Sequence, residues 1–458
     1  MSATVLLRGG EVVTAGDRFM ADVLCVDGKI AAVGPNLDVP VGAQVMNALG
    51  QYVLPGGVDA HTHMELPFMG TVSADDFYSG TAAGVAGGTT TIIDFIIPAR
   101  NQSLIEARDV WFANAQKSVA DYAFHMAVTW FSEAVRAHMG QVFRDNGISS
   151  FKAFMAYTGS IGVDDAELIE VIDTAKSLGA LVTVHCEHGV AVQHLQKKMM
   201  AAGKTGPRFH AESRPPWIEG EATNRAIMLA KCANEPIYVV HLTCKEALDA
   251  VYRAREEGQT VYVETCPQYL LLDDSVYLNE DFEIAAQYVM SPPIRPKGHQ
   301  DALWAALASG IIHTVATDHC PFRSDQKRAG EKDFTRIPNG AAGIENRLSL
   351  MHTYGVKTGK LSLEQFVDVC CTRPAKIFNL YPRKGSVTVG ADADLVVFDS
   401  KKTGTISGKT HRHKLDQSIF EGFATEGAVT HTVVNGKVVY QDGDLRVTRG
   451  AGRYLKRN

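Results

Sequence analysis

The stretch Tyr52-Val53-Leu54-Pro55-Gly56-Gly57-Val58-Asp59-Ala60-His61-Thr62-His63 joins an apolar run to two histidines separated by one residue. Side chains on a strand alternate between its two faces, so His61 and His63 are expected on one face at the end of a buried strand. Imidazole is a common ligand of zinc and related metals. The pair predicts half of a metal site, although such pairs also occur without a metal, and the remaining ligands have to be sought on later strands.

Outside this stretch, seven more short apolar runs alternate with helical segments, as in parallel βα units. The eight runs are 53–63, 89–95, 122–128, 149–154, 181–185, 237–241, 260–264 and 311–318. Eight is the number of strands that closes a TIM barrel. A doubly wound open sheet is the alternative, but no glycine-rich nucleotide turn follows the first run. We therefore expect an α/β fold with a (β/α)8 barrel over residues 55–382.

Both ends of the chain instead contain short strands with turns. The expected strands are 4–7, 11–13, 22–26 and 29–33 near the N-terminus and 386–389, 393–398 and 429–440 near the C-terminus, the last with a hairpin at Asn435-Gly436. Each set is too small to bury its own faces. We expect the two ends to pair into one small β-sandwich domain, residues 1–54 and 383–445. Residues 446–458 form a C-terminal tail that either takes part in assembly or frays.

The composition is that of an ordinary globular protein. The 458 residues are 45% hydrophobic and 21% charged, and 45 basic against 51 acidic residues give a net charge of −6. Because long runs of one sign are absent, we expect no nucleic-acid partner and no membrane-binding patch. The eight cysteines contain no Cys-x-x-Cys pair, and neither an export signal nor an apolar run of about 18 residues is seen. A cytoplasmic location is expected.

Several of the apolar runs end in residues that could bind a metal. In a TIM barrel the carboxyl ends of the strands form the active-site rim, and the residues there are His61, His63, Lys152, His185, His241 and Asp318. Each alone could be structural, because buried histidines bond to neighbours and an aspartate often caps a helix. Lys152 is the informative one, since a free ammonium has no lone pair for a metal. A carboxylated lysine would be anionic and could give one oxygen to each of two metals.

Seven motifs give the chain a resemblance, over nearly its whole length, to the dihydropyrimidinase and hydantoinase family of cyclic amidohydrolases in the amidohydrolase superfamily. They are residues 55–63, Ser150-Phe151-Lys152-Ala153-Phe154-Met155-Ala156-Tyr157, Val184-His185-Cys186-Glu187, Tyr238-Val239-Val240-His241, Met290-Ser291-Pro292-Pro293, Thr317-Asp318-His319-Cys320 and Ile337-Pro338-Asn339-Gly340. The resemblance implies two zinc ions per subunit, bridged by N6-carboxylated Lys152 and a hydroxide. His61, His63 and Asp318 would bind one ion, and His185 and His241 the other. Manganese or cobalt would suit the same ligands.

The same resemblance suggests a mechanism. Metal binding moves the pKa of water from ~15.7 to ~7, which supplies hydroxide at neutral pH. We hypothesise that this hydroxide attacks the ring carbonyl and that Asp318 takes its proton and passes it to the leaving nitrogen. Tyr157, by resemblance, donates a hydrogen bond to the developing oxyanion, although it could be only an aromatic packing residue.

Substrate recognition is expected from loops beside the metals. The family uses main-chain groups at Ser291 and Asn339 to bind a cyclic ureide, whereas the local sequence at both predicts only turns. Phe68, Phe154 and Ile161 would form an apolar wall for a substituent on ring carbon 5, or would pack as ordinary loop residues. The implied reaction converts dihydropyrimidines and 5-monosubstituted hydantoins to N-carbamoyl amino acids, with the D enantiomer preferred. Relatives are usually homotetramers.

Other family members and a non-enzyme remain as alternatives. Dihydroorotases and allantoinases typically carry an arginine where this chain has Glu65, whose charge we expect to repel a substrate carboxylate. An allantoinase or an L-hydantoinase type is still an alternative, and mononuclear deaminases lack the bridging lysine. A scaffold similar to the collapsin-response mediator proteins would have lost metal ligands, and here every ligand position is filled.

Overall fold

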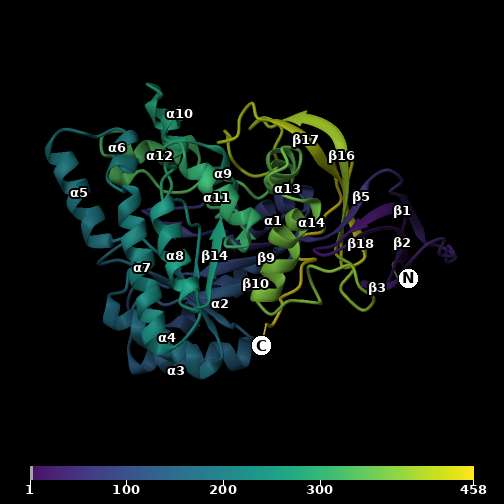
Figure 1. The fold of residues 1–458 in the computed structure, drawn as a ribbon, viewed down its shortest axis with the longest axis horizontal. Coiled ribbons are helices and arrows are strands. Elements are labelled where there is room, and N and C mark those ends of the chain that lie inside the picture. Colours follow the sequence, from purple (N-terminus) through teal and green to yellow (C-terminus); the bar gives the residue numbers. More distant parts are fainter. Residues whose placement is uncertain (1–3, 458) are drawn as a thin grey trace.

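A computed structural model describes residues 4–457 as a parallel barrel with a β-sheet attached to one side (Figure 1). The eight barrel strands pair in chain order: β6 (Gly57–Thr62), β9 (Thr89–Ile96), β10 (Asp121–Ala127), β11 (Ser150–Phe154), β12 (Leu181–His185), β13 (Ile237–Val239), β14 (Val261–Thr265) and β15 (Thr314–Val315). Nearly all of their side chains are buried, because helices cover the outside and side chains fill the inside. The predicted (β/α)8 architecture is confirmed.

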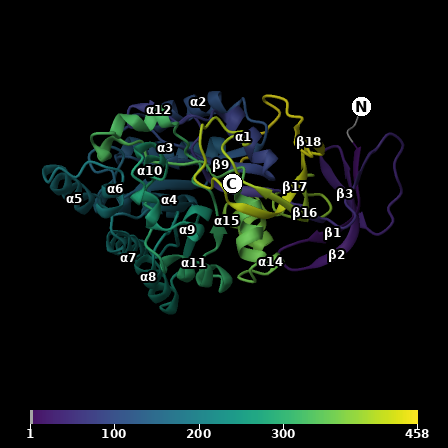
Figure 2. The same ribbon diagram turned by 90° about the horizontal axis from the view of Figure 1, so that it is seen from above.

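Helices follow most of the strands and pack around the barrel (Figures 1 and 2). The larger ones are α1 (Phe77–Ala86), α2 (Leu104–Ala115), α3 (Glu133–Asn146), α4 (Asp165–Leu178), α5 (Gly189–Ala201), α7 (Pro216–Ala233), α8 (Lys245–Glu256) and α11 (His299–Ala308). Shorter helices are α6 (Arg208–Glu212), α9 (Pro267–Leu271), α10 (Phe282–Gln287), α12 (Ser324–Lys327), α13 (Arg347–Met351), α14 (Leu363–Val367) and α15 (Arg373–Ile377). In the described part of the chain, none of the helices is both long enough and apolar enough to cross a membrane.

Side chains close the barrel between its first and last strands. Asp59 on β6 accepts hydrogen bonds from the backbone N–H (3.2 Å) and hydroxyl (2.6 Å) of Thr317. The buried guanidinium of Arg347 donates to the carbonyls of Val58 at 3.0 Å and Val315 at 2.9 Å. The eighth strand is shorter than the predicted run 311–318, since these side-chain bonds connect the first and last strands in place of a long backbone ladder.

The opening apolar run is not one strand, which corrects the prediction for residues 53–63. Tyr52–Pro55 forms β5 of the attached sheet, and the barrel strand β6 begins at Gly57. Gly56 lies at the break, where a Cβ atom would sit 2.0 Å from the Thr90 hydroxyl oxygen. A residue without a side chain is therefore required for the chain to pass from one sheet into the other.

The attached β domain combines both ends of the chain, as predicted, and its strands form one continuous sheet where we expected a sandwich. In Figure 2 the C-terminal strands β16 and β17 lie between the barrel and the N-terminal strands. The nine strands are β1 (Thr4–Val13), β2 (Arg18–Val26), β3 (Lys29–Gly34), β4 (Gln44–Asn47), β5 (Tyr52–Pro55), β16 (Leu395–Thr405), β17 (Ala424–Val434), β18 (Lys437–Gln441) and β19 (Asp444–Leu445). The antiparallel pairing of β5 with β16 joins the two halves.

Two details of the β domain differ from the predictions, and one agrees. Gly9-Gly10 is a bulge inside the single strand β1, where we expected a turn between two strands. Residues 386–389 do not form a strand, because the Ser386 hydroxyl bonds to the carbonyl of Pro382 and to the hydroxyl of Thr388. The hairpin at Asn435-Gly436 is confirmed, with φ values of 51° and 73° that suit a type I′ turn.

The C-terminal tail lies under the barrel and does not fray. The Leu455 N–H donates to the carbonyl of Tyr122 at 2.8 Å, and the Arg457 N–H donates to the carbonyl of Gly147 at 3.0 Å. The buried guanidinium of Arg457 also donates to the Ser150 hydroxyl at 2.8 Å. The tail therefore covers the amino ends of β10 and β11, at the opposite end of the barrel from the predicted ligands.

A buried ion cluster joins the barrel to the attached sheet. The ammonium of Lys384 contacts the carboxylates of Asp121 at 2.6 Å, of Asp392 at 3.0 Å and of Asp394. Asp121 begins a barrel strand, whereas Asp394 immediately precedes β16. Burial makes an unpaired carboxylate costly, and Lys384 is the buried cation that contacts all three, while the more exposed Arg453 also pairs with Asp121 and Asp392 at 2.9 Å.

Replacing Lys384 with methionine should lower the free energy of unfolding by about 3–5 kcal/mol, because three carboxylates lose their shared cation. Lys29→Met is the matched control, since Lys29 contacts Asp392 at 2.7 Å with 49% of its side chain exposed. That exposed contact should contribute less than about 1 kcal/mol. Urea unfolding followed by circular dichroism measures both variants, and equal losses would contradict the prediction.

Candidate metal centre and substrate cavity

The structure brings the six predicted metal ligands to one rim of the barrel. His61 lies on β6, Lys152 on β11 and His185 at the end of β12, and the other three follow the ends of β6, β13 and β15. The backbones of His241 and Asp318 have φ values of 36° and 50°. Such left-handed conformations are unfavourable for these residue types and are typical of functional sites.

His61, His63 and Asp318 form a compact group that could hold a metal ion. The Nε2 atoms of the two histidines are 3.2 Å apart. The Asp318 Oδ1 lies 3.3 Å from the His61 Nε2 and 3.1 Å from the His63 Nε2. The His63 Nδ1 is buried without a hydrogen-bond partner in the described chain. A cation between these lone pairs would satisfy the ligand atoms, so the donor set fits a metal such as zinc.

His185 and His241 form a second pair beside the first group. The His185 Nδ1 lies 3.0 Å from the His241 Nε2, and the rings of His61 and His241 are 5.3 Å apart. Burial lowers the pKa values of His61, His185 and His241, so these imidazoles are neutral and offer lone pairs. Two adjacent groups of ligands are compatible with two metal ions.

Lys152 is completely buried at this rim. Its ammonium lies 5.0 Å from the ring centres of Phe95 and Phe154, and it has no hydrogen-bond partner among the residues described. Burial lowers the pKa of Lys152 to about 8. A buried nitrogen without a partner is costly, and conversion to a carbamate that binds metal would remove this cost.

Two carboxylates that we did not predict as site residues orient the histidines. Glu264, at the end of β14, accepts from the His61 Nδ1 at 2.6 Å, from the Tyr238 hydroxyl at 2.8 Å and from the His241 backbone N–H at 3.1 Å. This contact leaves the His61 Nε2 free for a metal, as in other carboxylate–histidine pairs. Burial raises the pKa of Glu264 to about 7. The position of Glu264 at a strand end was the one feature of the sequence that could have indicated its place at the site.

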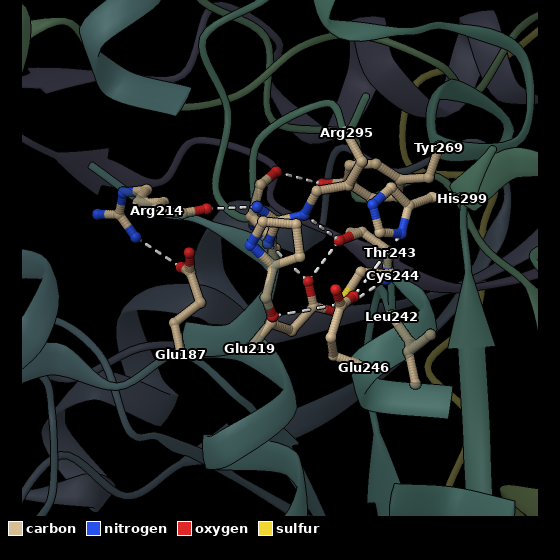
Figure 3. A network of polar contacts seen from close by, with 12 residues as sticks. Glu187, Arg214, Glu219, Leu242, Thr243, Cys244, Glu246, Tyr269, Arg295 and His299 are labelled. Carbon is tan, nitrogen blue, oxygen red and sulfur yellow. Dashed lines mark hydrogen bonds and ion pairs between the residues drawn. The ribbon is translucent and has the colours of Figure 1, made fainter. Parts of the chain in front are cut away.

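The second carboxylate, Glu187, belongs to the buried network of Figure 3. Its Oε2 lies 2.7 Å from the His185 Nε2 and 2.6 Å from the Arg214 guanidinium. Arg295 extends the network, because it donates to the Arg214 carbonyl and pairs with Glu219 at 2.7 Å. Burial works against the charged form, but Arg214 and His185 hold the pKa of Glu187 well below its ordinary value. His185 therefore presents its Nδ1 to the metal site.

All twelve predicted site residues line one cavity of about 620 Å³, and their roles stay predictions. Besides the six ligands, they are Phe68, Phe154, Tyr157, Ile161, Ser291 and Asn339. The Tyr157 ring stands edge-on to those of Phe68 and Phe154, at 5.6 and 6.1 Å, and lies 5.6 Å from His185. Burial raises the pKa of Tyr157, so its phenol keeps the proton that a hydrogen-bond donor needs.

One wall of the cavity was not predicted. Ile97 and Arg100 follow β9, and Trp111 lies on α2. Arg100 fixes this wall by donating to the carbonyls of Thr129 at 2.9 Å and Gly162 at 3.1 Å. The sequence gives no signal for Trp111, because a position on a helix does not indicate that its side chain reaches the barrel rim.

The expected role of Glu65 is wrong. Its carboxylate pairs with the Lys117 ammonium at 2.6 Å and accepts from the Phe77 backbone N–H at 3.5 Å. These contacts turn it toward α1 and away from the cavity. Because Lys117 pairs with this carboxylate and Glu65 is not among the residues that line the cavity, the geometry does not support repulsion of a substrate carboxylate by Glu65.

Known proteins are similar to this chain in both fold and sequence. Residues 52–439 match the amidohydrolase family. The D-hydantoinase of Geobacillus stearothermophilus is 46% identical over 456 residues, which cover 99% of this chain and 96% of that protein. The dihydropyrimidinase of Arabidopsis thaliana is 45% identical, over 99% of this chain and 86% of that protein. The crystal structure of dihydropyrimidinase from Brevibacillus agri is 45% identical and superposes with a TM-score of 0.98, over 99% of this chain and 98% of that one.

The agreement extends over both the barrel and the attached sheet, and it comes with a His-His-Asp group at the barrel rim. The resemblance seen in the sequence motifs is confirmed. This chain belongs to the dihydropyrimidinase and D-hydantoinase family of the amidohydrolase superfamily, and it is a hydrolase that acts on cyclic amides.

Proposed function

We propose that the protein hydrolyses dihydropyrimidines and 5-monosubstituted hydantoins to N-carbamoyl amino acids. The observation that carries this proposal is the convergence of two histidine groups on the unpartnered Lys152 ammonium, inside a cavity of about 620 Å³ that could admit a small ring. The family relation supports a cyclic amide as the reacting group, and the apolar wall supports an uncharged substituent.

Two divalent metal ions and an N6-carboxylated Lys152 are the cofactors that fit these residues. We propose zinc, with His61, His63 and Asp318 holding one ion, His185 and His241 the other, and the carbamate contributing to both. When bound, such ions supply a hydroxide nucleophile at neutral pH and polarise a carbonyl oxygen. The neutral imidazoles and the unpartnered buried nitrogen support this assignment.

The chain's own residues then have separate tasks. Asp318 lies 3.1 Å from His63 at the centre of the rim, where its carboxylate can take a proton and return it to the leaving ring nitrogen. Tyr157 lines the same cavity and can donate from its hydroxyl to the developing oxyanion. Main-chain groups of Ser291 and Asn339 would bind the two sides of the ureide.

The outer cavity would select the ring substituent. Phe68, Phe154 and Ile161 face the wall that Trp111 and Ile97 complete. Such an apolar surface favours alkyl and aryl groups at ring carbon 5 by burying them from water. We propose the D enantiomer as the preferred hydantoin, supported by the relation to a protein named D-hydantoinase. A cytoplasmic homotetramer remains our proposal for the assembled form, which the mass in solution would test.

Relative rates on three substrates test the proposed function. Wild-type protein loaded with zinc should hydrolyse dihydrouracil and D-5-phenylhydantoin, with kcat/KM for the L enantiomer at least about tenfold lower because a few kcal/mol of wall contacts separate them. Product formation is followed by loss of ring absorbance and by chromatography of the N-carbamoyl acid. No turnover of any of the three by protein holding two metals would refute the proposal.

Lys152→Ala should lose both metal and activity. We expect affinity for zinc to fall at least about 100-fold, because the group that bridges the ions is gone. Metal per chain is measured by mass spectrometry after dialysis against a weak chelator. Short carboxylic acids such as formate should partly restore metal and turnover by replacing the carbamate, whereas Lys152→Arg should stay inactive in their presence. Full zinc content in the alanine variant would contradict the assignment.

Tyr157→Phe separates catalysis from packing. The change keeps the ring contacts with Phe68 and Phe154 but removes the hydroxyl, so kcat should fall about 10²–10³-fold if that hydroxyl stabilises the oxyanion. Zinc content and the melting temperature should match the wild type. A variant with full kcat would show that Tyr157 only packs.

A further inference from the structure

The carbonyl groups around Ser291 are held by side chains from four different segments. Four buried side chains donate to the carbonyls of residues 288, 289, 290 and 292. In chain order the bonds are the Tyr277 hydroxyl to the Tyr288 carbonyl (3.0 Å), the Lys327 ammonium to the Val289 carbonyl (2.9 Å), the His210 Nε2 to the Met290 carbonyl (2.9 Å) and the Tyr269 hydroxyl to the Pro292 carbonyl (2.8 Å). Over residues 4–457, no hydrogen bond reaches the Ser291 carbonyl. This acceptor stays available beside the metal ligands, on a backbone that its neighbours hold in place.

Lys327 differs from the other donors because it holds two segments at once. Its ammonium donates to the carbonyls of Gln287 at 3.4 Å, Val289 at 2.9 Å and Gly340 at 2.9 Å. An ammonium has three N–H donors, so these three acceptors use all of them. Val289 lies two residues before Ser291, and Gly340 directly follows Asn339. The lysine therefore ties the Ser291 segment (residues 287–292) to the Asn339 segment (residues 337–341).

Further contacts lie across the same junction. The Gly340 N–H donates to the Val289 carbonyl at 3.0 Å, and the Asn339 side-chain amide donates to the Ser291 hydroxyl at 3.0 Å. Lys327 itself ends α12, which packs beside α10 (Figure 1). The two segments thus meet through a small set of polar bonds, of which the ammonium makes three.

Packing alone does not explain a lysine at this position. Lys327 is 2% exposed, and no carboxylate among the described residues forms an ion pair with it. Burial lowers the pKa of Lys327 to about 7. A methionine of similar length would fill the space without the cost of desolvating a charge. Unlike methionine, the ammonium bonds to three carbonyl groups and so fixes the distances between them.

We infer that Lys327 is a positioning residue for the substrate ring, because it sets the Ser291 carbonyl and the Asn339 main chain at the spacing that a cyclic ureide needs. A ureide offers an N–H donor and a carbonyl acceptor on one rigid ring, so both protein groups have to be in place together. This inference rests on the proposed function, in which Ser291 and Asn339 bind the ring. It assigns Lys327 to substrate recognition and leaves the metal centre independent of it.

Kinetics of the zinc-loaded Lys327→Met enzyme test the inference. KM for dihydrouracil should rise roughly tenfold or more, with a smaller change in kcat, because bonds from a charged donor are lost away from the reacting atoms. Zinc content should be unchanged, and inhibition by acetohydroxamate, which binds metal without a ureide, should stay within about twofold of wild type. Lys332→Met, in the same loop but exposed, is the matched control and should behave as wild type. Lys327→Gln, which keeps two donors, should give an intermediate KM and replaces the methionine variant if that one does not fold.

Hydrogen exchange provides a readout that does not depend on turnover. In Lys327→Met the amides of residues 287–292 and 337–341 should exchange faster together, while the barrel strands keep wild-type rates. Unchanged exchange in both segments, or an equal rise in KM and in the acetohydroxamate inhibition constant, would overturn the inference. Failure of the wild type to hydrolyse any cyclic ureide would instead refute the proposed function, and the exchange result would then decide the role of Lys327 in holding the two segments.

Discussion

The buried nitrogen of Lys152 is the constraint on which the rest of the site depends. It belongs to Lys152 at the middle of barrel strand β11, with aromatic rings at 5.0 Å and no hydrogen-bond partner among the described residues. A core lysine of this kind is stable only if something satisfies it. The neighbouring groups are imidazoles, which accept metals, and the carboxylates of Asp318 and Glu264, whose charges favour the ammonium but which form no ion pair with it among the described residues. In the function we propose, an anionic lysine derivative together with bound metal would satisfy this nitrogen and the imidazoles, which would link the fold to hydrolytic chemistry.

At the same rim, two histidines present different ring nitrogens to the metal site. Glu264 binds the Nδ1 of His61, whereas Glu187 binds the Nε2 of His185. Each carboxylate fixes which nitrogen remains for the metal, and each is fixed in turn, the first by Tyr238 and the second by Arg214. Ligand geometry is thus determined by residues that never reach the cavity, and it is set by folding before any metal or substrate arrives.

Sequence patterns predicted the parts of the molecule that follow from periodicity and from the shared position of strand ends. Alternating apolar runs identified the barrel, and strand ends identified His61, Lys152 and Asp318. The parts that were missed depend on contacts between distant segments. Gly56 breaks a strand because of Thr90, Glu65 is neutralised by Lys117, and Trp111 reaches the cavity from a helix. None of these pairings leaves a local signal, because each partner lies tens of residues away in the chain.

These contacts also divide the site into parts with different rigidity. Of the six predicted metal ligands, three stand on barrel strands and three follow the ends of such strands, most of which are paired by backbone ladders on both sides. The segments around Ser291 and Asn339, which we propose bind the ring, lie outside the barrel strands, and side-chain donors hold them, Lys327 above all. The proposed wall for the ring substituent is held through Arg100, which donates to the Thr129 carbonyl in a part-buried bond and forms an exposed ion pair with Glu167. Breaking the ring bond needs the most exact geometry, and choosing among ring substituents needs the least. A change in the outer loops can therefore alter which ring is accepted while the chemistry at the metal centre stays the same.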